Sequence, residues 1–493
     1  MSLGINPKAD FCAARELWRG LNRYSRGFLT RPHDYERPTS ISSWPTLALG
    51  SWCIDVAPGL PWGSAETEGV QVVILGECFG ISSVTIDNHA VALRVAKLIA
   101  QQQVDASHDY VEQLTGRFAI FAATACELTV YNDPIGSFGV YWHRDRIKSQ
   151  TLLSSHTKLI SEAVGGLAST EAQAVLGSPD YISPGGKALP GLLTGNDGVF
   201  PLFPNCYLTI CGSEVSHRRF YPRRDQKQYE PIEAFQVMHD EILRQARLWL
   251  SLEGEVFLGL TAGGDCKTIL GTALEDFQKR GVTAFTYHFF ATDNPSTHTD
   301  LLEANRRALV TQLPHLIADV GKLEKDSLEG KVYSESFAGW FRFPALAGMV
   351  YRTLPRKSIF VSSVGGEVGT GFYREREENL FEPAVMARRY TTSPFARNPE
   401  IIQEMERYSE YVEFEKLADV NVDPYDFFYS EHRLGKWFSL WCSEFDLATR
   451  TAIPMNSRKL FAVMQSFPTE YRLSGQLYRD YWERFGLNTM DIR

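Results

Sequence analysis

Residues 260–270 read LTAGGDCKTIL and decide the class of the second half of the chain. The apolar run VFLGL ends at Leu260, and the segment after Lys267, ILGTALEDFQKRG, has apolar residues at helical spacing. The order is therefore a strand, a glycine-rich turn and a helix. Because the first N–H groups of a helix lack intrahelical partners, such a turn can bind an anion such as phosphate. A plain β–α turn with a capping Asp265 has the same pattern, so the stretch alone leaves both interpretations open.

Helices and strands alternate on both sides of this turn. Apolar residues at helical spacing predict a helix over 233–252, and a strand over 256–260 follows it. Beyond the turn, a strand over 282–290 and a helix over 299–313 continue the alternation. This order is typical of a parallel sheet with covering helices. From Tyr373 onward the pattern is mainly helical.

The first half of the chain has the pattern of a β-rich domain. Short β-type runs between turn residues begin at about Leu47 and include VQVVILGECF, RFAIFAA, LTVYND and FGVYWHRD. An amphipathic helix is expected over 89–103. The expected organisation is an arm over 1–45, a β-rich domain over 46–225, a charged linker over 217–231 and an α/β domain over 230–493.

The composition excludes several classes of partner. The chain has 493 residues and a formal net charge of −9, whereas nucleic-acid-binding proteins are usually basic. No apolar run approaches the ~20 residues of a membrane-spanning helix, and the N-terminus lacks the apolar core of a signal peptide. The eight cysteines form no CxxC pair, as expected for reduced thiols. We expect a cytoplasmic protein without a nucleic acid or membrane partner, and the sequence leaves a homodimer open.

Three segments, in order, carry a resemblance to a known family. They are LTGRFAIFAATACELTVYNDPIGSFGVYW (114–142), TAGGDCKTI (261–269) and VSSVGGEVGTGFY (361–373). Together they resemble the asparagine synthetase-like amide-forming enzymes, including the β-lactam synthetases, in which the second segment is a pyrophosphatase-type loop (PP-loop). The later segments DFFYSEHRLGKW and TAIPMNSRKL resemble the late helices of the same family.

The resemblance implies an α+β, glutaminase-like β-sandwich domain of the N-terminal-nucleophile (Ntn) type. It also implies an α/β PP-loop synthetase domain, similar to the adenine nucleotide alpha hydrolases, with a helical C-terminal part. In the family, this second domain uses ATP and Mg²⁺ to convert a carboxylate into an acyl-adenylate and releases pyrophosphate. An amine then displaces AMP, so the implied partners are a small-molecule or peptide carboxylate and an amine or ammonia.

The nucleotide-binding residues implied by the resemblance lie on two loops. Glycines let the backbone approach phosphate closely, and a carboxylate there requires a metal ion between itself and the phosphates. Asp265 and Glu367 are the expected Mg²⁺ ligands. The expected contacts with ATP and pyrophosphate are Leu260, Thr261, Ala262, Gly263, Gly264, Asp265, Cys266, Lys267, Gly365 and Gly366.

The expected catalytic groups are Glu367, Tyr351, Lys436 and Arg433. Tyr351 and Tyr333 lie upstream of the second loop, and in the β-lactam synthetases a Tyr–Glu pair abstracts a proton. Packing between helices is the simpler explanation for either tyrosine. Arg433 and Lys436 are three residues apart on an expected helix, so they share a face that is directed toward phosphate, a substrate carboxylate or solvent.

The motifs depart from the family pattern at several positions. The glutaminase domain of the family begins with Cys after the initiator Met, whereas this chain has Ser2 and its first cysteine is Cys12. We therefore expect no glutaminase activity. Ala262 replaces a glycine, and Val364 stands where asparagine synthetases carry a Glu. Gln476 lies near the place of the late lysine that contacts pyrophosphate in the family.

The main hypothesis is an ATP- and Mg²⁺-dependent ligase that adenylates a carboxylate and joins it to an amine. The amine belongs either to the same substrate, as in a ring closure, or to a second molecule. Two alternatives stay open: a scaffold that has lost catalysis, and a glutamine-dependent amidotransferase. Ala262 and Val364 favour the first alternative, and Ser2 counts against the second.

Overall fold

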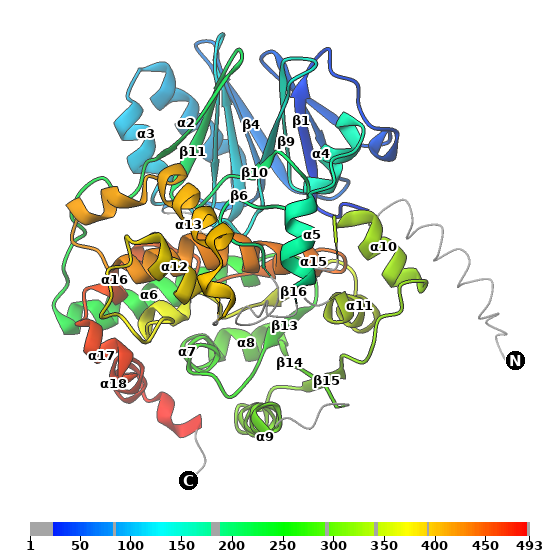
Figure 1. Ribbon diagram of the computed structural model, residues 1–493. Coiled ribbons are helices and arrows are strands. Elements are labelled where there is room, and N and C mark those ends of the chain that lie inside the picture. The colour runs from blue at the N-terminus through cyan, green and yellow to red at the C-terminus, as the bar shows by residue number, and fades with distance from the viewer. Residues whose placement is uncertain are drawn as a thin grey trace, which may run out of the picture.

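The computed structural model describes residues 23–81, 85–178, 188–290, 295–339, 344–391 and 394–490, except for the side chains of 295–297 and 489–490. Ser2 and Cys12 lie outside these ranges. Figure 1 shows a β-rich part, formed by the first half of the chain, above an α/β part. None of the helices in the described ranges combines the length and the apolar character needed to cross a membrane.

The β-rich part consists of two six-stranded antiparallel sheets. The first has the order β10–β8–β9–β1–β3–β2, with strands Phe28–Pro32 (β1), Thr46–Leu49 (β2), Trp52–Val56 (β3), Tyr141–Asp145 (β8), Gln150–Ser154 (β9) and Val199–Pro201 (β10). The second has the order β12–β11–β7–β6–β5–β4, with strands Trp62–Thr67 (β4), Val70–Phe79 (β5), Thr115–Ala123 (β6), Leu128–Asn132 (β7), Cys206–Cys211 (β11) and Glu214–Arg219 (β12).

Strand β6 supplies side chains to two cores. Phe118 packs in the core under helix α2 (Asn88–Ala100), which with α3 (Val104–Val111) covers the outer side of the second sheet. Phe121 points the other way and meets Phe28 of the first sheet, with ring centroids 5.2 Å apart. Successive side chains of a strand face opposite sides, so one apolar strand can serve both layers. Helix α4 (Thr157–Val164) packs on β8 and β9, so the expected layered β-sandwich is confirmed.

Two expected boundaries move. Strand β1 lies between β9 and β3, so the chain from residue 28 belongs to the sandwich and not to an arm that ends at residue 45. The apolar pattern of FLTRP is interrupted by Arg31, whose Nε donates to Oδ2 of Asp55 at 2.7 Å, and this buried charge hid the strand. Strand β12 extends to Arg219, so the linker begins at Phe220 and not at residue 217.

The second half of the chain forms a five-stranded parallel sheet with the order β15–β14–β13–β16–β17. Its strands are Val256–Gly259 (β13), Thr283–His288 (β14), His315–Asp319 (β15), Ser358–Val361 (β16) and Thr449–Ala452 (β17). Phe285 of β14 contacts the ring of Phe360 of β16, with centroids 5.8 Å apart. The expected alternation of helices and parallel strands is confirmed.

Helices surround this sheet and fill most of the chain after β16 (Figure 1). Those before β16 are Pro231–Leu250 (α6), Gly264–Thr272 (α7), Leu274–Arg280 (α8), Pro295–Val310 (α9), Leu328–Ser336 (α10) and Pro344–Thr353 (α11). Those after it include Gly366–Gly369 (η2), Pro383–Tyr390 (α12), Pro399–Tyr411 (α13), Phe414–Asp419 (η4), Pro424–Phe428 (α14), Tyr429–Phe438 (η5), Ser439–Phe445 (α15), Arg458–Gln465 (α16), Thr469–Leu473 (α17) and Gln476–Arg484 (α18).

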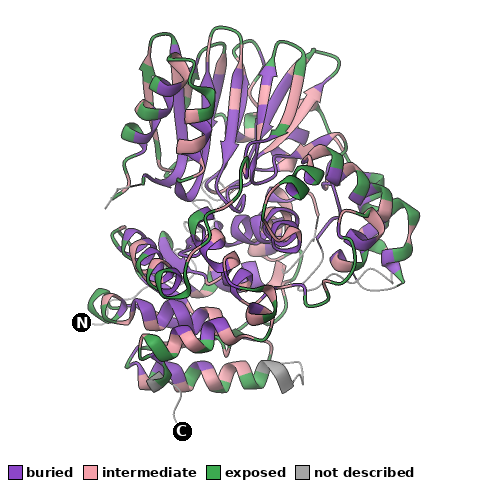
Figure 2. Cartoon of the chain, turned by 90° about the vertical axis from the view of Figure 1, so that its left-hand side faces the viewer, coloured by how far each residue is buried: buried purple, intermediate pink, exposed green. Residues whose placement is uncertain are grey.

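Buried ion pairs join the two parts of the molecule. Arg117 of β6 donates two hydrogen bonds of 2.6 Å to the carboxylate of Asp446. Arg219 of β12 makes a second bidentate pair with Glu431, at 2.5 and 2.8 Å. Figure 2 shows buried residues in the strands of the sandwich and in the helices below them. Because separating a buried pair would leave uncompensated charges, these pairs fix the sandwich on the α/β part.

Candidate functional site

The order of the parallel sheet marks where a ligand fits. From β13 the chain builds outward through β14 and β15, and then returns to the other side of β13 with β16 and β17. In open α/β sheets, ligands bind beyond the carboxyl ends of the strands at the point where this direction changes. That point lies between β13 and β16, and the loops that follow these two strands are the two loops of the expected nucleotide site.

Side-chain donors hold the loop after β13 by hydrogen bonds to its backbone carbonyl oxygens. Helix α7 begins at Gly264. The Sγ of buried Cys266 donates toward the carbonyl oxygens of Thr261 and Gly263, each at 3.2 Å. Nη1 of Arg307 on α9 donates to the same two oxygens, at 2.9 and 2.8 Å. Cys266 therefore shapes the turn, and Arg307, which the sequence did not single out, supports it from the neighbouring helix.

Two N–H groups of the loop already have acceptors. The N–H of Ala262 donates to Oδ1 of Asp300 at 3.0 Å, and the N–H of Gly263 donates to Oγ1 of Thr261 at 3.1 Å. A carboxylate oxygen at the first of these groups shows that the turn can accept an oxyanion. Phosphate would have to replace Asp300 at that position. Asp300 is also absent from the set expected from the sequence.

The two expected metal ligands meet. A Cβ placed on Gly366 would lie 2.6 Å from Oδ1 of Asp265, so only glycine lets the second loop approach this carboxylate. Burial, then the negative charge of Glu367, raises the pKa of Asp265 well above 3.8. Within the described residues, Oδ1 of Asp265 has no hydrogen-bond partner. The N–H of Gly365 donates to Oε2 of Glu367 at 2.9 Å. The structure thus brings two partly buried acids together.

Two tyrosine hydroxyls complete this acid pair. The hydroxyl of Tyr429 donates to Oε2 of Glu367 at 2.6 Å, and that of Tyr478 donates to the carbonyl oxygen of Gly366 at 2.6 Å. Burial raises the pKa of both phenols, so both act as donors at neutral pH. Neither was expected from the sequence. Tyr429 lies within the segment DFFYSEHRLGKW, and Tyr478 lies two residues after Gln476. The resemblance of these segments to the family pointed to this part of the chain, but a tyrosine alone does not indicate a site.

Two of the expected nucleotide contacts have other neighbours. The Nζ of buried Lys267 lies 4.0 Å from the ring centroid of Trp482, a cation–π contact. The N–H of Leu260 donates to Phe285, and its carbonyl oxygen accepts from Thr286 at 2.7 Å, so its backbone belongs to the sheet. The structure leaves a direct contact of either residue with phosphate as a prediction.

Arg433 and Lys436 have different surroundings. Both lie on η5, a π-helix, where the three-residue spacing of an α-helix face does not hold. The guanidinium of Arg433 lies 4.5 Å from the ring centroid of Phe372, which stacks on Tyr429 at 4.8 Å. Arg433 therefore contacts Glu367 only indirectly, through the ring of Phe372 and then Tyr429, whose hydroxyl donates to Glu367.

Lys436 binds a backbone segment instead. Its Nζ donates to the carbonyl oxygens of Pro190, Gly191 and Leu193 at 3.3, 2.6 and 2.7 Å. Burial lowers the pKa of Lys436 to about 7. Three carbonyl acceptors match the three N–H bonds of an ammonium, so this geometry holds the charged form. The contacts describe a positioning residue, and the catalytic role implied by the resemblance stays a prediction.

Tyr351 and Tyr333, the two tyrosines considered as proton acceptors, have hydrogen-bond partners other than Glu367. The hydroxyl of Tyr351 on α11 accepts from Arg356, and burial raises the pKa of this phenol to about 12. Tyr333 on α10 donates to Oε1 of Glu444 at 2.6 Å. Both occur in one apolar cluster between α10, α11 and α15. The Tyr–Glu contact at the acid pair is made by Tyr429.

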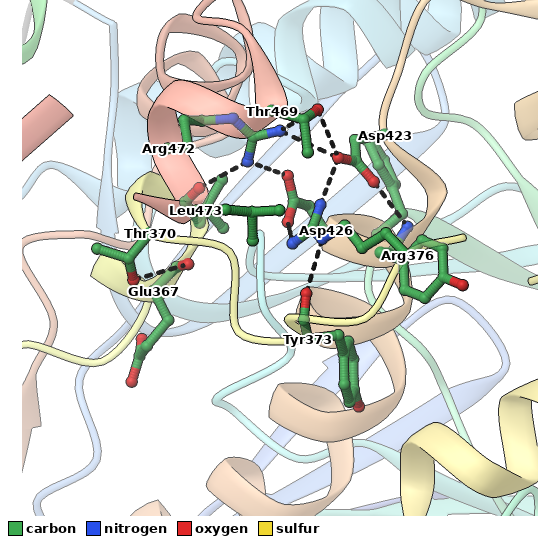
Figure 3. Close-up of polar contacts among 12 residues, drawn as sticks. Glu367, Thr370, Tyr373, Arg376, Asp423, Asp426, Thr469, Arg472 and Leu473 are labelled. Carbon is green, nitrogen blue, oxygen red and sulfur yellow. Dashed lines mark hydrogen bonds and ion pairs between the residues drawn. The ribbon is translucent and has the colours of Figure 1, made fainter. Parts of the chain in front are cut away.

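An ion network of two arginines and two aspartates contacts the second loop at Val368 (Figure 3). Nη1 of Arg472 donates to the carbonyl oxygen of Val368 at 2.8 Å and to Oδ2 of Asp426 at 2.5 Å. Arg376 donates to Asp423 and, at 2.7 Å, to Oδ1 of Asp426. The partners of Arg472 are these carboxylates and the carbonyl of Val368, so Arg472 positions the loop that carries Glu367.

Comparison with known proteins adds remote likenesses only. No family model and no curated protein matches the sequence. The chain is similar to a glutamine phosphoribosylpyrophosphate amidotransferase from B. subtilis complexed with ADP and GMP, with 13% identity over 72% of this chain and 75% of that chain, and a TM-score of 0.23. It is also similar to an allosteric regulatory enzyme of purine biosynthesis, with 12% identity over 70% of each chain and a TM-score of 0.24.

A third solved structure is similar over a shorter part. It is a glutamine aminotransferase class-II domain protein from Silicibacter pomeroyi, with 9% identity, 40% of this chain and 99% of that chain covered, and a TM-score of 0.24. TM-scores this low carry no weight for function. The site and the layers described above rest on the geometry of this chain alone.

Proposed function

We propose that this chain is an ATP- and Mg²⁺-dependent ligase that adenylates a carboxylate and joins it to an amine. The observation that supports this function is the meeting of Asp265 and Glu367 at the N-terminus of α7. Each acid follows one of two adjacent parallel strands, at the point where the sheet order reverses. A helix N-terminus for phosphate next to two carboxylates for a metal ion fits a nucleotide with its cation.

The acid pair fits Mg²⁺ by charge. Two partly buried carboxylates close to each other repel, and a divalent cation would remove that repulsion. The described residues contain no group of three or more His, Cys, Asp or Glu that could hold a metal ion. Asp265 and Glu367 would therefore hold Mg²⁺ together with phosphate oxygens and water, as is common for this ion. When bound, it would neutralise charge that develops on the phosphates.

Other groups of the chain orient the two acids and would orient the phosphates. Tyr429 keeps Glu367 oriented, and Tyr478 holds the backbone of Gly366 beside Asp265. The N–H groups at the start of α7 would orient the phosphates once Asp300 leaves Ala262. Burial raises the pKa of Tyr351 to about 12, so as a base at neutral pH it would need a further positive charge beside it, and its expected catalytic role stays a prediction.

Calorimetry with ATP tests this function, first with and without Mg²⁺. We expect binding that requires Mg²⁺ and that Asp265→Asn abolishes, while Asp419→Asn, an exposed aspartate on η4, binds as the wild type does. Turnover with a carboxylate and an amine should then release AMP and pyrophosphate. ADP and phosphate as products would contradict the adenylation chemistry.

A scaffold without catalysis is the second candidate. It is favoured by the engaged N–H groups of Ala262 and Gly263 and by the contact of Lys267 with Trp482. The same calorimetry separates the two, because a scaffold that has lost the site binds no ATP at millimolar concentration. Binding that does not depend on Mg²⁺ would also favour the scaffold.

A glutamine-dependent amidotransferase is the third candidate, which the sequence leaves open. In Ntn enzymes the nucleophile needs a free α-amine at the start of its strand. Here the chain continues ahead of β1, where Tyr24 is fully buried and Arg26 donates to Glu77 at 2.5 Å. We therefore expect no glutamate release from glutamine, and an assay that detects it would favour this third function.

A further inference from the structure

The buried arginines of the described residues differ in one respect. Six of them bind a carboxylate: Arg26, Arg31, Arg117, Arg219, Arg307 and Arg472. The seventh, Arg458, is 3% exposed and does not. Its Nε donates to Oδ1 of Asn205 at 2.7 Å, whereas Nη1 and Nη2 have no hydrogen-bond partner. A buried guanidinium that no carboxylate pairs with destabilises the folded protein, because its charge has lost water without gaining an anion in return.

Aromatic rings only partly replace the missing anion. The guanidinium of Arg458 lies 5.1 Å from the ring centroid of Phe220 and 5.4 Å from that of Tyr221. A cation–π contact offers no oxygen to the two free Nη groups, so the hydrogen-bonding capacity of this side chain stays unused. Burial lowers the pKa of Arg458, which is the physical sign of the same cost.

Arg458 lines a pocket between the two parts of the molecule. The walls come from the linker, α6 and α16, with the end of α3 at one side. Arg244 of α6 also lines the pocket, and its buried Nη1 has no hydrogen-bond partner among the described residues, although its Nε and Nη2 bind Glu241. Further basic side chains at the pocket are Arg223, Arg224, Lys227 and Lys459, and the acids are Glu112, Asp225, Asp240 and Glu241.

Most of these rim charges already have partners. Arg223 pairs with Asp105 and Asp109, Arg224 with Asp109 and Lys227 with Glu233. Among the described residues that line the pocket, Arg458 and Arg244 have buried guanidinium nitrogens without a hydrogen-bond partner. Guanidinium N–H pairs match the oxygens of carboxylates and phosphates, often two at a time.

We propose that this pocket binds the carboxylate or phosphate group of a small molecule through Arg458 and Arg244. The site is separate from the acid pair, because none of the residues expected to bind the nucleotide lines the pocket. The proposal does not depend on the proposed ligase activity. It places a second, anion-recognising site at the junction of the sandwich, the linker and the α/β part, where a bound ligand would touch both parts.

The test is a titration of the full chain with inorganic phosphate and, separately, with acetate, followed by calorimetry and thermal unfolding. We expect at least one of the two anions to bind in the millimolar range or tighter and to raise the Tm. The stronger of the two identifies the phosphate or the carboxylate as the recognised group. Absence of binding by both anions would overturn the proposal.

Two variants locate the binding. Arg458→Met should abolish the response to the anion and should raise the Tm in anion-free buffer, because it removes a buried charge that no carboxylate contacts directly. Arg244→Met should weaken binding by about tenfold, since it removes one charge-assisted contact. Arg247→Met on the same helix is the matched control, since Arg247 is exposed and pairs with Asp276.

The remaining outcomes separate this pocket from the acid pair and from a folding defect. Asp265→Asn should keep the anion response unchanged. Loss of the response in Asp265→Asn but not in Arg458→Met would place the anion at α7 and overturn the proposal. If Arg458→Met fails to fold, the comparison of Arg244→Met with Arg247→Met decides, and equal anion affinities in those two variants would overturn it.

Discussion

Two clusters of partly or fully buried charged side chains lie next to each other in the α/β part and differ in their balance of positive and negative charge. In the network of Figure 3, Arg376 and Arg472 face two aspartates, cation for anion. At the acid pair, Asp265 and Glu367 meet, and the side-chain groups hydrogen-bonded there are tyrosine hydroxyls. The carbonyl of Val368, next to Glu367, accepts from Arg472, so one loop joins both. The balanced network shapes the loop, and the unbalanced pair is the place where a cation fits.

The same substitution should therefore have opposite consequences in the two clusters. Asp426→Asn removes the anion that two buried guanidinium groups share, and we expect a loss of about 3–5 kcal/mol in the free energy of unfolding. Urea denaturation measures it. Asp419→Asn, on the surface, should stay within about 0.5 kcal/mol of the wild type. A loss for Asp426→Asn no larger than that of the control would show that the network contributes little to stability.

Asp265→Asn should not lower stability in the absence of ligand, because it removes one of two like charges. The pKa of Asp265 is raised above 3.8 in the folded protein, so the folded state holds this proton more tightly than the unfolded chain does. That stabilisation is complete below about pH 4 and is lost as the pH rises through the folded-state pKa. The wild type should thus lose stability relative to Asp265→Asn on going from pH 4 to pH 8.

Denaturation of both proteins at several pH values checks this slope, and Mg²⁺ with ATP should reduce it for the wild type alone. Parallel stability curves for the two proteins would mean that the carboxyl of Asp265 titrates normally. Such a result would remove the charge imbalance that distinguishes this cluster from the network of Figure 3.

The sequence predicted the two loops of the site better than the side chains that contact those loops from other helices. The glycine-rich turn after an apolar strand placed Asp265 correctly at the start of a helix, because turn and periodicity are local properties. It placed Glu367 on the second loop through the order of the motifs. Asp300, Tyr429 and Tyr478 reach the site from distant helices, and only the packing of those helices brings them there.

Strand β1 was missed for a related reason. Its Arg31 reads as a surface residue in the sequence, but the structure pairs it with Asp55 on the neighbouring strand. A partner 24 residues away cannot be read from local alternation. Likewise, the three-residue spacing of Arg433 and Lys436 predicted one shared face, but the π-helical geometry of η5 gives the two side chains different surroundings.

Tyr429→Phe tests whether the hydroxyl at the acid pair serves ligand binding. We expect a loss of about 1 kcal/mol in Mg²⁺–ATP affinity, near fivefold, since one hydrogen bond to a carboxylate is removed. Tyr333→Phe is the matched control, because its hydroxyl also donates to a glutamate at 2.6 Å but in another cluster. Equal ATP affinities in the two variants would leave Tyr429 with a structural role only.

Asp300→Asn is expected to have the smallest effect and the opposite sign. The carboxylate of Asp300 occupies the N–H of Ala262, so it competes with phosphate and also repels it. The amide keeps an oxygen that can accept this hydrogen bond but carries no charge, so ATP should bind about threefold more tightly, as for removal of one partly solvated charge. Calorimetry at low and high salt would show the difference shrinking as salt screens the repulsion. Weaker ATP binding by the variant would instead mean that Asp300 holds the turn in the conformation that binds ATP. Asp300 would then be a third carboxylate that supports the site, beside Asp265 and Glu367.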